Sequence, residues 1–202
     1  MLVSQAVRAR RSIRKFQDKD ISSGHIQTML EAARLAPSGL NAQPWRFKVI
    51  QDREEIAWMA LEAGQGQRWL KSARAVFVCC ADLKGYMQDA GANVRMLRDS
   101  GILPLEMLAG IEDYVARASQ AGPELVRGAA AANCFIAITQ MILQAVELGL
   151  GTCWVGMYDE EAIKNRFSIP GEMAVVALLA AGYPAEDPQP RPRKSLDEIL
   201  IP

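Results

Sequence analysis

The chain has 202 residues, half of them hydrophobic, with 23 basic and 23 acidic side chains. This length and apolar share are sufficient for one domain with a sizeable core, and no uninterrupted run of about 18 apolar residues indicates a membrane span. A net charge of zero argues against the broad basic face with which proteins bind duplex nucleic acid. We therefore expect a single domain over residues 1–202, with no nucleic-acid or membrane partner.

Positive charge is concentrated at the start of the chain. Residues 1–20 carry six Lys or Arg against two Asp, and RRSIRKF at 10–16 holds four of the basic side chains. These arginines also interrupt the apolar segment that a secretory signal requires, so we expect a cytoplasmic protein. A local basic excess in a neutral chain predicts a local anion, and a small phosphate-bearing ligand fits better than nucleic acid.

The first half of the chain alternates predicted helices and strands. Apolar residues at helical spacing in 2–7 predict a short amphipathic helix, and a second helix starts at Ser22 or Ser23 and ends before Pro37. The turn-rich loop APSGLNAQPW follows at 36–45. The next predicted elements are a half-exposed strand at 45–49, a helix at 56–63 and a fully buried strand at 75–81.

The second half begins with its least regular part. Glycines and a proline interrupt residues 84–122, so no regular element is predicted there. A long core helix over 124–148 ends at Gly149, and it precedes a short strand at 151–156, a short helix at 160–167 and a buried strand at 174–183. The proline-rich tail, 184–202, is predicted to be extended and to lie against a partner subunit.

The sulfur and imidazole side chains offer no metal site in the sequence. The four cysteines lie in apolar runs without metal-ligand spacing, and we interpret them as reduced core residues: Cys79, Cys80, Cys134 and Cys153. His25 is the single histidine and falls in the first turn of a predicted helix, where we expect no catalytic role.

Four motifs in order, RRSIRKF, APSGLNAQPW, LGLGTCWVG and RPRKSLDEI, resemble those of the nitroreductase family of flavin enzymes. The resemblance covers almost the whole chain and is weakest at 84–122. It implies an α+β fold with a mixed, mainly antiparallel central sheet flanked by helices. It also implies an intertwined homodimer with one FMN in each interface cleft.

The resemblance assigns the basic residues at both ends of the chain to FMN. It places Arg10, Ser12 and Arg14 against the flavin nucleotide, with Arg11 beside them. Guanidinium groups bind a phosphate through bidentate, charge-assisted hydrogen bonds, so a second pair on the tail completes a clamp: Arg191 and Arg193. A solvated basic loop is the ordinary interpretation of such a charge run, but the accompanying motifs outweigh it.

Two further motifs and one glutamine are assigned to the flavin ring. In 36–45, amides can both donate to and accept from the pyrimidine edge, and the residues assigned to the flavin are Pro37, Ser38, Gly39, Asn41 and Gln43. The resemblance implies that Ser38 and Asn41 approach the flavin from the opposite subunit. An ordinary turn would explain Pro37 and Gly39 equally well. Backbone groups near Trp154, Val155 and Gly156 are assigned to the reactive face. Gln67 is either a polar flavin contact or a solvated loop residue.

The implied function is an FMN-dependent oxidoreductase that passes hydride from NAD(P)H through the flavin to a nitroaromatic, a quinone or a similar small-molecule acceptor in a ping-pong cycle. No GxGxxG or Walker motif is present, so the nicotinamide would bind transiently. A dehalogenase or flavin-breakdown enzyme on the same fold, or a non-enzymatic flavin-binding or storage protein, remains open.

The irregular segment 84–122 is expected to act as a lid that selects the acceptor. Its apolar cover would comprise Tyr86, Met87, Met96, Leu97, Met107 and Tyr114, although a plain packing role would account for them equally well.

Overall fold

The computed structural model describes residues 1–120 and 122–201. Its strands are β1 (Trp45–Ile50), β2 (Ala75–Asp82), β3 (Gly151–Val155) and β4 (Met173–Gly182). Its α-helices are α1 (Val3–Ala9), α2 (Ser23–Arg34), α3 (Arg53–Trp58), α4 (Leu83–Ser100), α5 (Leu105–Ser119), α6 (Pro123–Glu147), α7 (Glu160–Phe167) and α8 (Leu196–Ile199). Two short 3₁₀ helices, η1 (Gly39–Asn41) and η3 (Arg68–Ser72), and one π-helical segment, η2 (Met59–Ala63), are also present.

The strands form one four-stranded sheet in the order β1-β2-β4-β3. All three strand pairs are antiparallel, with Phe77 of β2 opposite Val49 of β1 and Leu179 of β4. Within the described residues, parallel pairing is limited to an isolated bridge between Ser12 and Thr152. The expected α+β class and the mainly antiparallel sheet are therefore confirmed. The parallel pairing expected of a mixed sheet is present only as the bridge between Ser12 and Thr152 among the described residues.

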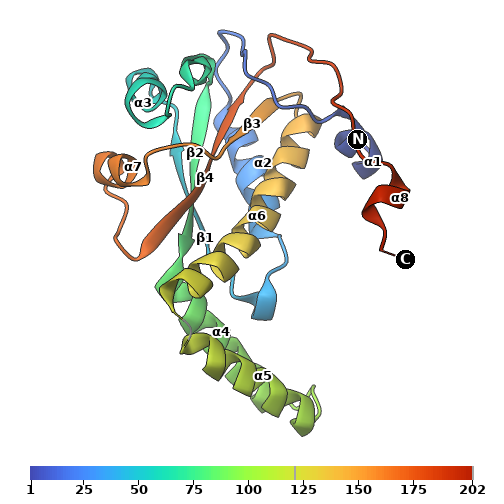
Figure 1. Ribbon diagram of the computed structural model, residues 1–202. Helices are drawn as coiled ribbons and strands as arrows, with labels where there is room; N and C mark the ends of the chain where they lie inside the picture. The colour runs from blue at the N-terminus through green and yellow to red at the C-terminus, as the bar shows by residue number, and fades with distance from the viewer. Residues whose placement is uncertain (121, 202) are drawn as a thin grey trace.

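Helices cover both faces of the sheet, as Figure 1 shows. Side chains alternate across a strand, so Phe77 and Cys79 of β2 pack in a core with α2 and α6. Val76 and Val78 face the opposite core, formed with α3, η2 and α7. This double cover explains why β2 reads as a continuous apolar run, and it confirms the predicted fully buried strand.

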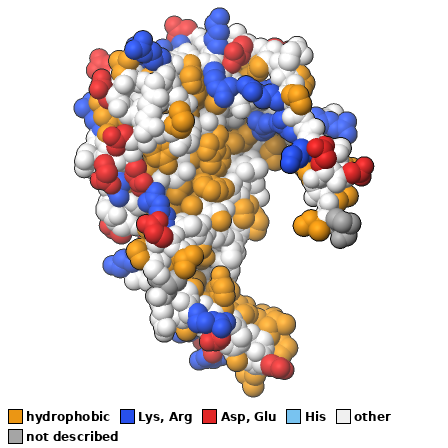
Figure 2. Space-filling view, in the orientation of Figure 1, with side chains coloured by type: hydrophobic (Ala, Val, Ile, Leu, Met, Phe, Trp, Pro, Cys, Tyr) orange, Lys and Arg blue, Asp and Glu red, His pale blue; other side chains and the backbone are white. Residues whose placement is uncertain are grey.

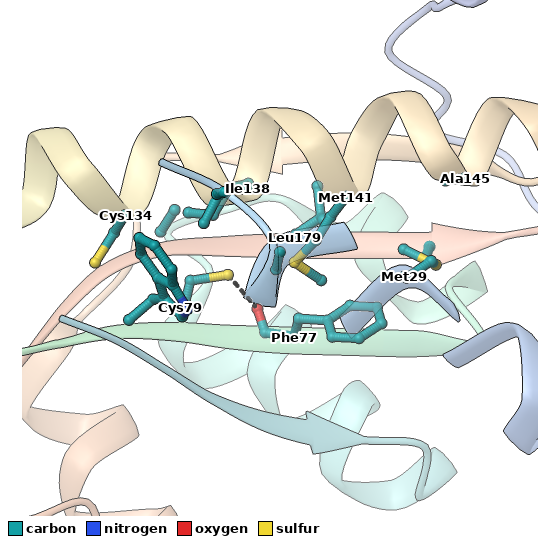
Figure 3. Packing of buried hydrophobic residues seen from close by; sticks show 14 of the residues in the cluster. Met29, Phe77, Cys79, Cys134, Ile138, Met141, Ala145 and Leu179 are labelled. Carbon is teal, nitrogen blue, oxygen red and sulfur yellow. Dashed lines mark hydrogen bonds between the residues drawn. The ribbon is translucent and has the colours of Figure 1, made fainter. Parts of the chain in front are cut away.

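The long helix α6 forms the centre of one core. Figure 3 shows its residues Cys134, Ile138 and Met141 turned toward Phe77 and Leu179 of the sheet. Among the described residues, α6 is also the one helix long and apolar enough to cross a membrane, a property it shares with core helices. The predicted core helix is confirmed, and Gly149 follows its end in a left-handed conformation.

Shortening Ile138 by one methyl group tests this packing. Ile138 has no exposed surface, so Ile138→Val should lower the free energy of unfolding by about 0.5–1.5 kcal/mol. Ile102→Val is the matched control, because Ile102 is 75% exposed and should lose little. Denaturant unfolding at one fixed protein concentration measures both, and equal losses would contradict the assignment of Ile138 to the core.

The segment 84–122 differs from the prediction. It forms the helical hairpin α4–α5, which projects from the body in Figure 1. A glycine inside a helix costs only about 1 kcal/mol, so Gly91 and Gly110 do not interrupt these helices. Gly101 is the residue that ends α4, with a φ of 65°, and Pro104 precedes α5. The prediction of an irregular segment was wrong.

The tail is extended from Pro184 onward, as predicted, but not to its end. Ser195 and Glu198 form a capping box that starts the short helix α8, so the last part of the predicted extended segment is helical. Residues 189–201 are all exposed, and Figures 1 and 2 show this tail standing away from the body. In a single chain, residues 189–201 therefore remain exposed to solvent and are not buried against the rest of the protein.

The cysteines are buried and free, as the sequence predicts. Burial raises the pKa of Cys80 to about 11 and that of Cys134 to about 12. Both thiols therefore stay protonated at neutral pH and act as small apolar side chains. His25 lies in the first turn of α2, also as predicted.

Candidate functional site

A cavity of about 380 Å³ lies where the exit of α1 meets the C-terminal tail. It gathers six of the predicted site residues from the two ends of the chain: Arg10, Arg11, Ser12, Arg14, Arg191 and Arg193. Arg8 of α1 joins them. Figure 2 shows basic side chains gathered where the tail leaves the body. We call this space the arginine cavity.

Backbone pairing places the N-terminal wall of the arginine cavity. The N–H of Ile13 donates to the carbonyl of Thr152 at 2.9 Å, so residues 12–13 run beside β3. The N–H of Gln17 donates to the carbonyl of Tyr183 at 2.8 Å. The N–H of Ala185 donates to the carbonyl of Lys15 at 2.8 Å, so the start of the tail lies beside this segment. The segment 12–17 therefore lies between β3 and the tail.

Two glycines permit this close approach. A Cβ on Gly151 would lie 2.6 Å from Cγ1 of Ile13, and a Cβ on Gly182 would lie 2.7 Å from Cδ1 of Phe16. Both distances are well inside van der Waals contact, so any other residue would push the segment off the sheet. Glycine at 151 and 182 therefore allows residues 12–17 to pack closely enough on the sheet to form the wall of the arginine cavity.

Positive charge dominates the arginine cavity, and the nearby carboxylate of Glu186 accepts from the backbone N–H groups of Arg14 and Lys15. None of its six guanidinium groups, on residues 8, 10, 11, 14, 191 and 193, is paired with a carboxylate in the described part of the chain. Arg11 and Arg193 donate instead to backbone carbonyls of their own segments. Arginine forks match the geometry of phosphate oxygens, so this donor set suits a phosphate group.

A second group of predicted residues lies at the far end of β3, the strand that runs beside Ser12. Val155 is buried, Trp154 is half-buried and Gly156 is exposed just beyond the strand. With a rise of about 3.3 Å per residue, Val155 lies roughly 10 Å along the strand from Thr152. The arginine cavity and the 154–156 segment are therefore joined by one rigid element.

Gln67 is tied to this second group. Its side-chain amide donates to the carbonyl of Met157 at 2.8 Å, next to Gly156. The neighbouring Tyr158 hydroxyl donates to the carbonyl of Val175 at 2.9 Å, and burial raises its pKa to about 12, so it stays protonated. The sequence predicted that Gln67 is either a flavin contact or a solvated residue. The structure shows a third role, because this hydrogen bond holds the loop that follows β3.

The 36–45 loop has an unusual backbone. Leu40, Asn41 and Gln43 have φ values of 51°, 53° and 43°, in the left-handed region that non-glycine residues seldom adopt. The hydroxyl of Ser38 accepts from the N–H of Gln43 at 3.0 Å across the turn. Strained backbone of this kind persists where surrounding contacts hold it, and it is common at functional sites.

Two asparagines from neighbouring helices hold this loop. Oδ1 of Asn133 on α6 accepts from the N–H of Gly39 at 2.9 Å. Nδ2 of Asn93 on α4 donates to the carbonyls of Leu40 at 2.8 Å and Asn41 at 3.1 Å. Sequence reasoning missed both, along with Arg8. The signal for Asn133 was an asparagine directly after a run of four alanines in an apolar helix.

The role of Asn133 can be measured by amide exchange. Asn133→Ala removes the acceptor of the Gly39 N–H, and one hydrogen bond contributes about 0.5–1.5 kcal/mol. We expect the Gly39 amide to exchange roughly two- to tenfold faster, with global stability little changed. Gln140→Ala, about two turns along α6, is the control. Unchanged Gly39 exchange in Asn133→Ala would contradict this bracing role.

Within one chain the predicted site residues do not form a single site. The 36–45 loop, with Pro37, Ser38, Gly39, Asn41 and Gln43, lies at the end of the molecule away from α1 and the tail, as Figure 1 shows. Asn41 and Gln43 line another cavity, whose lining includes none of the residues of the arginine cavity. The expectation that this loop serves the flavin of the opposite subunit stays a prediction.

Comparison with known proteins identifies the chain. The model of the nitroreductase family matches residues 7–183. The chain belongs to the nitroreductase family. It is therefore an oxidoreductase of this family of NAD(P)H-dependent flavin enzymes, and the resemblance noted in the sequence is confirmed.

Individual relatives extend this result. A protein of Thermus thermophilus named NADH dehydrogenase is 32% identical over 95% of this chain and 91% of its own length. A 5,6-dimethylbenzimidazole synthase of Rhodospirillum rubrum is 28% identical, over 88% of this chain and 80% of its own.

Solved structures share the fold. An Exiguobacterium sibiricum protein, assigned provisionally as a nitroreductase and solved in complex with FMN, superposes with a TM-score of 0.82. It is 24% identical, and the match covers 100% of this chain and 97% of the other. This likeness shows the common fold of the two chains.

Proposed function

We propose that this nitroreductase-family enzyme binds FMN with its phosphate in the arginine cavity and passes hydride from NAD(P)H to a nitroaromatic, a quinone or a similar acceptor in a ping-pong cycle. The observation that carries the proposal is the set of six arginines without carboxylate partners around one cavity. An FMN phosphate carries nearly two negative charges near neutral pH, which this cavity would neutralise.

Chain geometry supports the placement of the rest of the cofactor. The strand β3 leads from the arginine cavity to Trp154, Val155 and Gly156, so a nucleotide anchored at Ser12 can lie along it. When bound, FMN supplies the hydride transfer between donor and acceptor. The chain supplies position, backbone N–H groups near Gly156, and the apolar side chains that exclude water.

A homodimer is part of this proposal. The apolar residues of α8 and the chain end stand in solvent: Leu196, Ile199, Leu200 and Ile201. On α1, Val3 and Val7 are exposed as well. Figure 2 shows an apolar concave face between this tail and the body. A second copy that fills the concavity would cover these residues and could bring its 36–45 loop to the flavin. We expect this dimer to work in the cytoplasm.

Stopped-flow spectroscopy tests the redox function. Mixing the FMN-loaded protein anaerobically with NADH or NADPH should bleach the visible absorbance of the flavin. A second mixing with menadione should restore it, because acceptor and nicotinamide use the flavin in turn. A flavin that stays oxidised with both nucleotides would contradict the proposed NAD(P)H oxidoreductase.

Flavin breakdown is a second candidate, favoured by the similarity to the 5,6-dimethylbenzimidazole synthase. The two functions differ in what happens to the flavin itself. An oxidoreductase should return its FMN intact after many turnovers, whereas a flavin-breakdown enzyme should consume reduced FMN in the presence of oxygen. Chromatography of released flavin after prolonged turnover separates them.

A further inference from the structure

The carboxylate of Glu186 lies at the start of the C-terminal tail, beside the segment that carries the N-terminal arginines. It accepts hydrogen bonds from two consecutive backbone N–H groups, that of Arg14 and that of Lys15, the latter at 3.1 Å. Glu186 is exposed, and no basic side chain of the described residues forms an ion pair with it. It therefore joins the two ends of the chain through backbone groups, and we call this pair of hydrogen bonds the tail anchor.

The segment 12–17 does not depend on Glu186 for its own position. Besides the backbone bonds described above, Arg74 at the start of β2 holds it from below the sheet edge. Nε of Arg74 donates to the carbonyl of Gln17 at 2.8 Å, and its N–H donates to the carbonyl of Ala181 on β4 at 2.8 Å. This arginine is buried, so its position is fixed by packing. The segment is therefore a fixed support, and the tail anchor holds the tail against it.

Beyond Glu186, the tail forms no further hydrogen bond or ion pair with the body in the described part of the chain. Arg193 donates only within the tail, to the carbonyls of Arg191 and Pro192. Prolines at 188, 190 and 192 fix φ and remove backbone donors, so this stretch is extended and stiff. With a rise of about 3.1 Å per residue, Arg191 and Arg193 lie at most roughly 16 and 22 Å along the tail from Glu186. The direction in which the tail leaves Glu186 therefore decides where both guanidinium groups lie.

We infer that Glu186 is a positioning residue of the proposed phosphate site. By accepting from Arg14 and Lys15, its carboxylate anchors the tail. The anchored tail then holds Arg191 and Arg193 across the arginine cavity from the N-terminal arginines. The inference rests on the proposed function, because it concerns the site assigned to the FMN phosphate.

The sign of the charge effect separates this role from simple electrostatics. Removing a carboxylate near a cluster of arginines makes the local potential more positive, so by charge alone Glu186→Ala should tighten the binding of an anion. The anchor role predicts weaker binding. Asp187→Ala is the matched control, because it removes the same charge from the next residue, which forms no hydrogen bond or ion pair within the described chain. A loss of FMN affinity in Glu186→Ala alone therefore identifies the tail anchor.

Titration of the apoprotein with FMN and with riboflavin measures this role. Glu186→Ala should weaken FMN binding at least about tenfold and riboflavin binding hardly at all, because the tail anchor acts on the phosphate site. Glu186→Gln keeps a side-chain oxygen that can accept the backbone bonds, and should stay within about threefold of the unaltered protein. Asp187→Ala should bind FMN at least as tightly as the unaltered protein. Equal FMN affinities in Glu186→Ala and Asp187→Ala, or equal losses in Glu186→Ala and Glu186→Gln, would overturn the inference.

A double-mutant cycle identifies the tail as the part that Glu186 positions. Arg193→Ala should weaken FMN binding about ten- to hundredfold in the unaltered protein. In the Glu186→Ala background the same change should cost at most about threefold, because the guanidinium group is already displaced. Losses of the same size in both backgrounds would show that Glu186 does not act through the tail, against the inference.

Amide exchange of the flavin-free protein tests the tail anchor without a ligand. The N–H of Lys15 should exchange roughly two- to tenfold faster in Glu186→Ala than in Asp187→Ala, with global stability little changed. Unchanged exchange would remove the tail anchor and with it the inference. Faster exchange in a protein that binds FMN no more tightly than riboflavin would confirm the tail anchor and overturn the proposed function.

Discussion

Replacing Arg10 and Arg193 together by alanine is expected to weaken FMN binding by about 10²- to 10⁴-fold. The two side chains line the arginine cavity from opposite ends of the chain. A charge-assisted hydrogen bond contributes about 1.5–3 kcal/mol, or roughly ten- to hundredfold in affinity, and two independent losses add. Riboflavin has no phosphate, so its weaker binding should hardly change.

Titration of the apoprotein with FMN and with riboflavin measures this difference. Lys194→Ala is the matched control, because it removes a positive charge from the same tail at a position that does not line the arginine cavity. The single variants Arg10→Ala and Arg193→Ala should each show part of the loss. If the double variant weakens FMN and riboflavin equally, the arginines do not bind the phosphate.

The second large effect is expected from Ile199→Asp combined with Leu200→Asp. These side chains are 61% and 65% exposed in the single chain, and the proposed dimer buries them. Burying one such side chain contributes about 1.5–3 kcal/mol, and the dimer loses four of them, two from each chain, so its dissociation constant should rise by at least roughly 10⁴-fold. Placing carboxylates in an apolar interface adds to this loss.

Sedimentation velocity over a dilution series checks the assembly. The unaltered protein should sediment as one species near twice 22.2 kDa at micromolar concentration, and the double variant should dissociate. Asp197→Asn changes an exposed polar residue of the same helix and should remain dimeric. A double variant that stays dimeric at every concentration would remove the tail from the interface, and an unaltered FMN-loaded monomer would exclude the proposed dimer.

Local sequence patterns predicted most of the secondary structure because each core strand and helix carries its own periodicity. The continuous apolar run 75–81 reflects a strand that is covered on both faces. The apolar residues around most of the helix predicted at 124–148 reflect the packing of that helix against the sheet and α2. The prediction failed at 84–122, because Gly85, Gly91 and Gly110 lie inside helices rather than ending them. Each costs a helix only about 1 kcal/mol, and packing of α4 on α5 and α6 compensates.

The candidate site was predictable in its residue types but not in its assembly. A cluster of arginines at 10–14 indicates an anion from sequence alone, whereas its meeting with Arg191 and Arg193 depends on the close approach that Gly151 and Gly182 allow. The bracing of the 36–45 loop by Asn93 and Asn133 links residues far apart in the chain, so no local pattern reveals it. The apolar groove among α4, α5, α6 and Leu40 likewise depends on how these helices converge.

The absorption spectrum of the purified protein tests the central claim most directly. We predict a yellow protein whose denaturation releases FMN, rather than riboflavin, at about one per chain, because the arginine cavity requires a phosphate. A colourless protein that gains no flavin spectrum on titration with FMN would contradict the account.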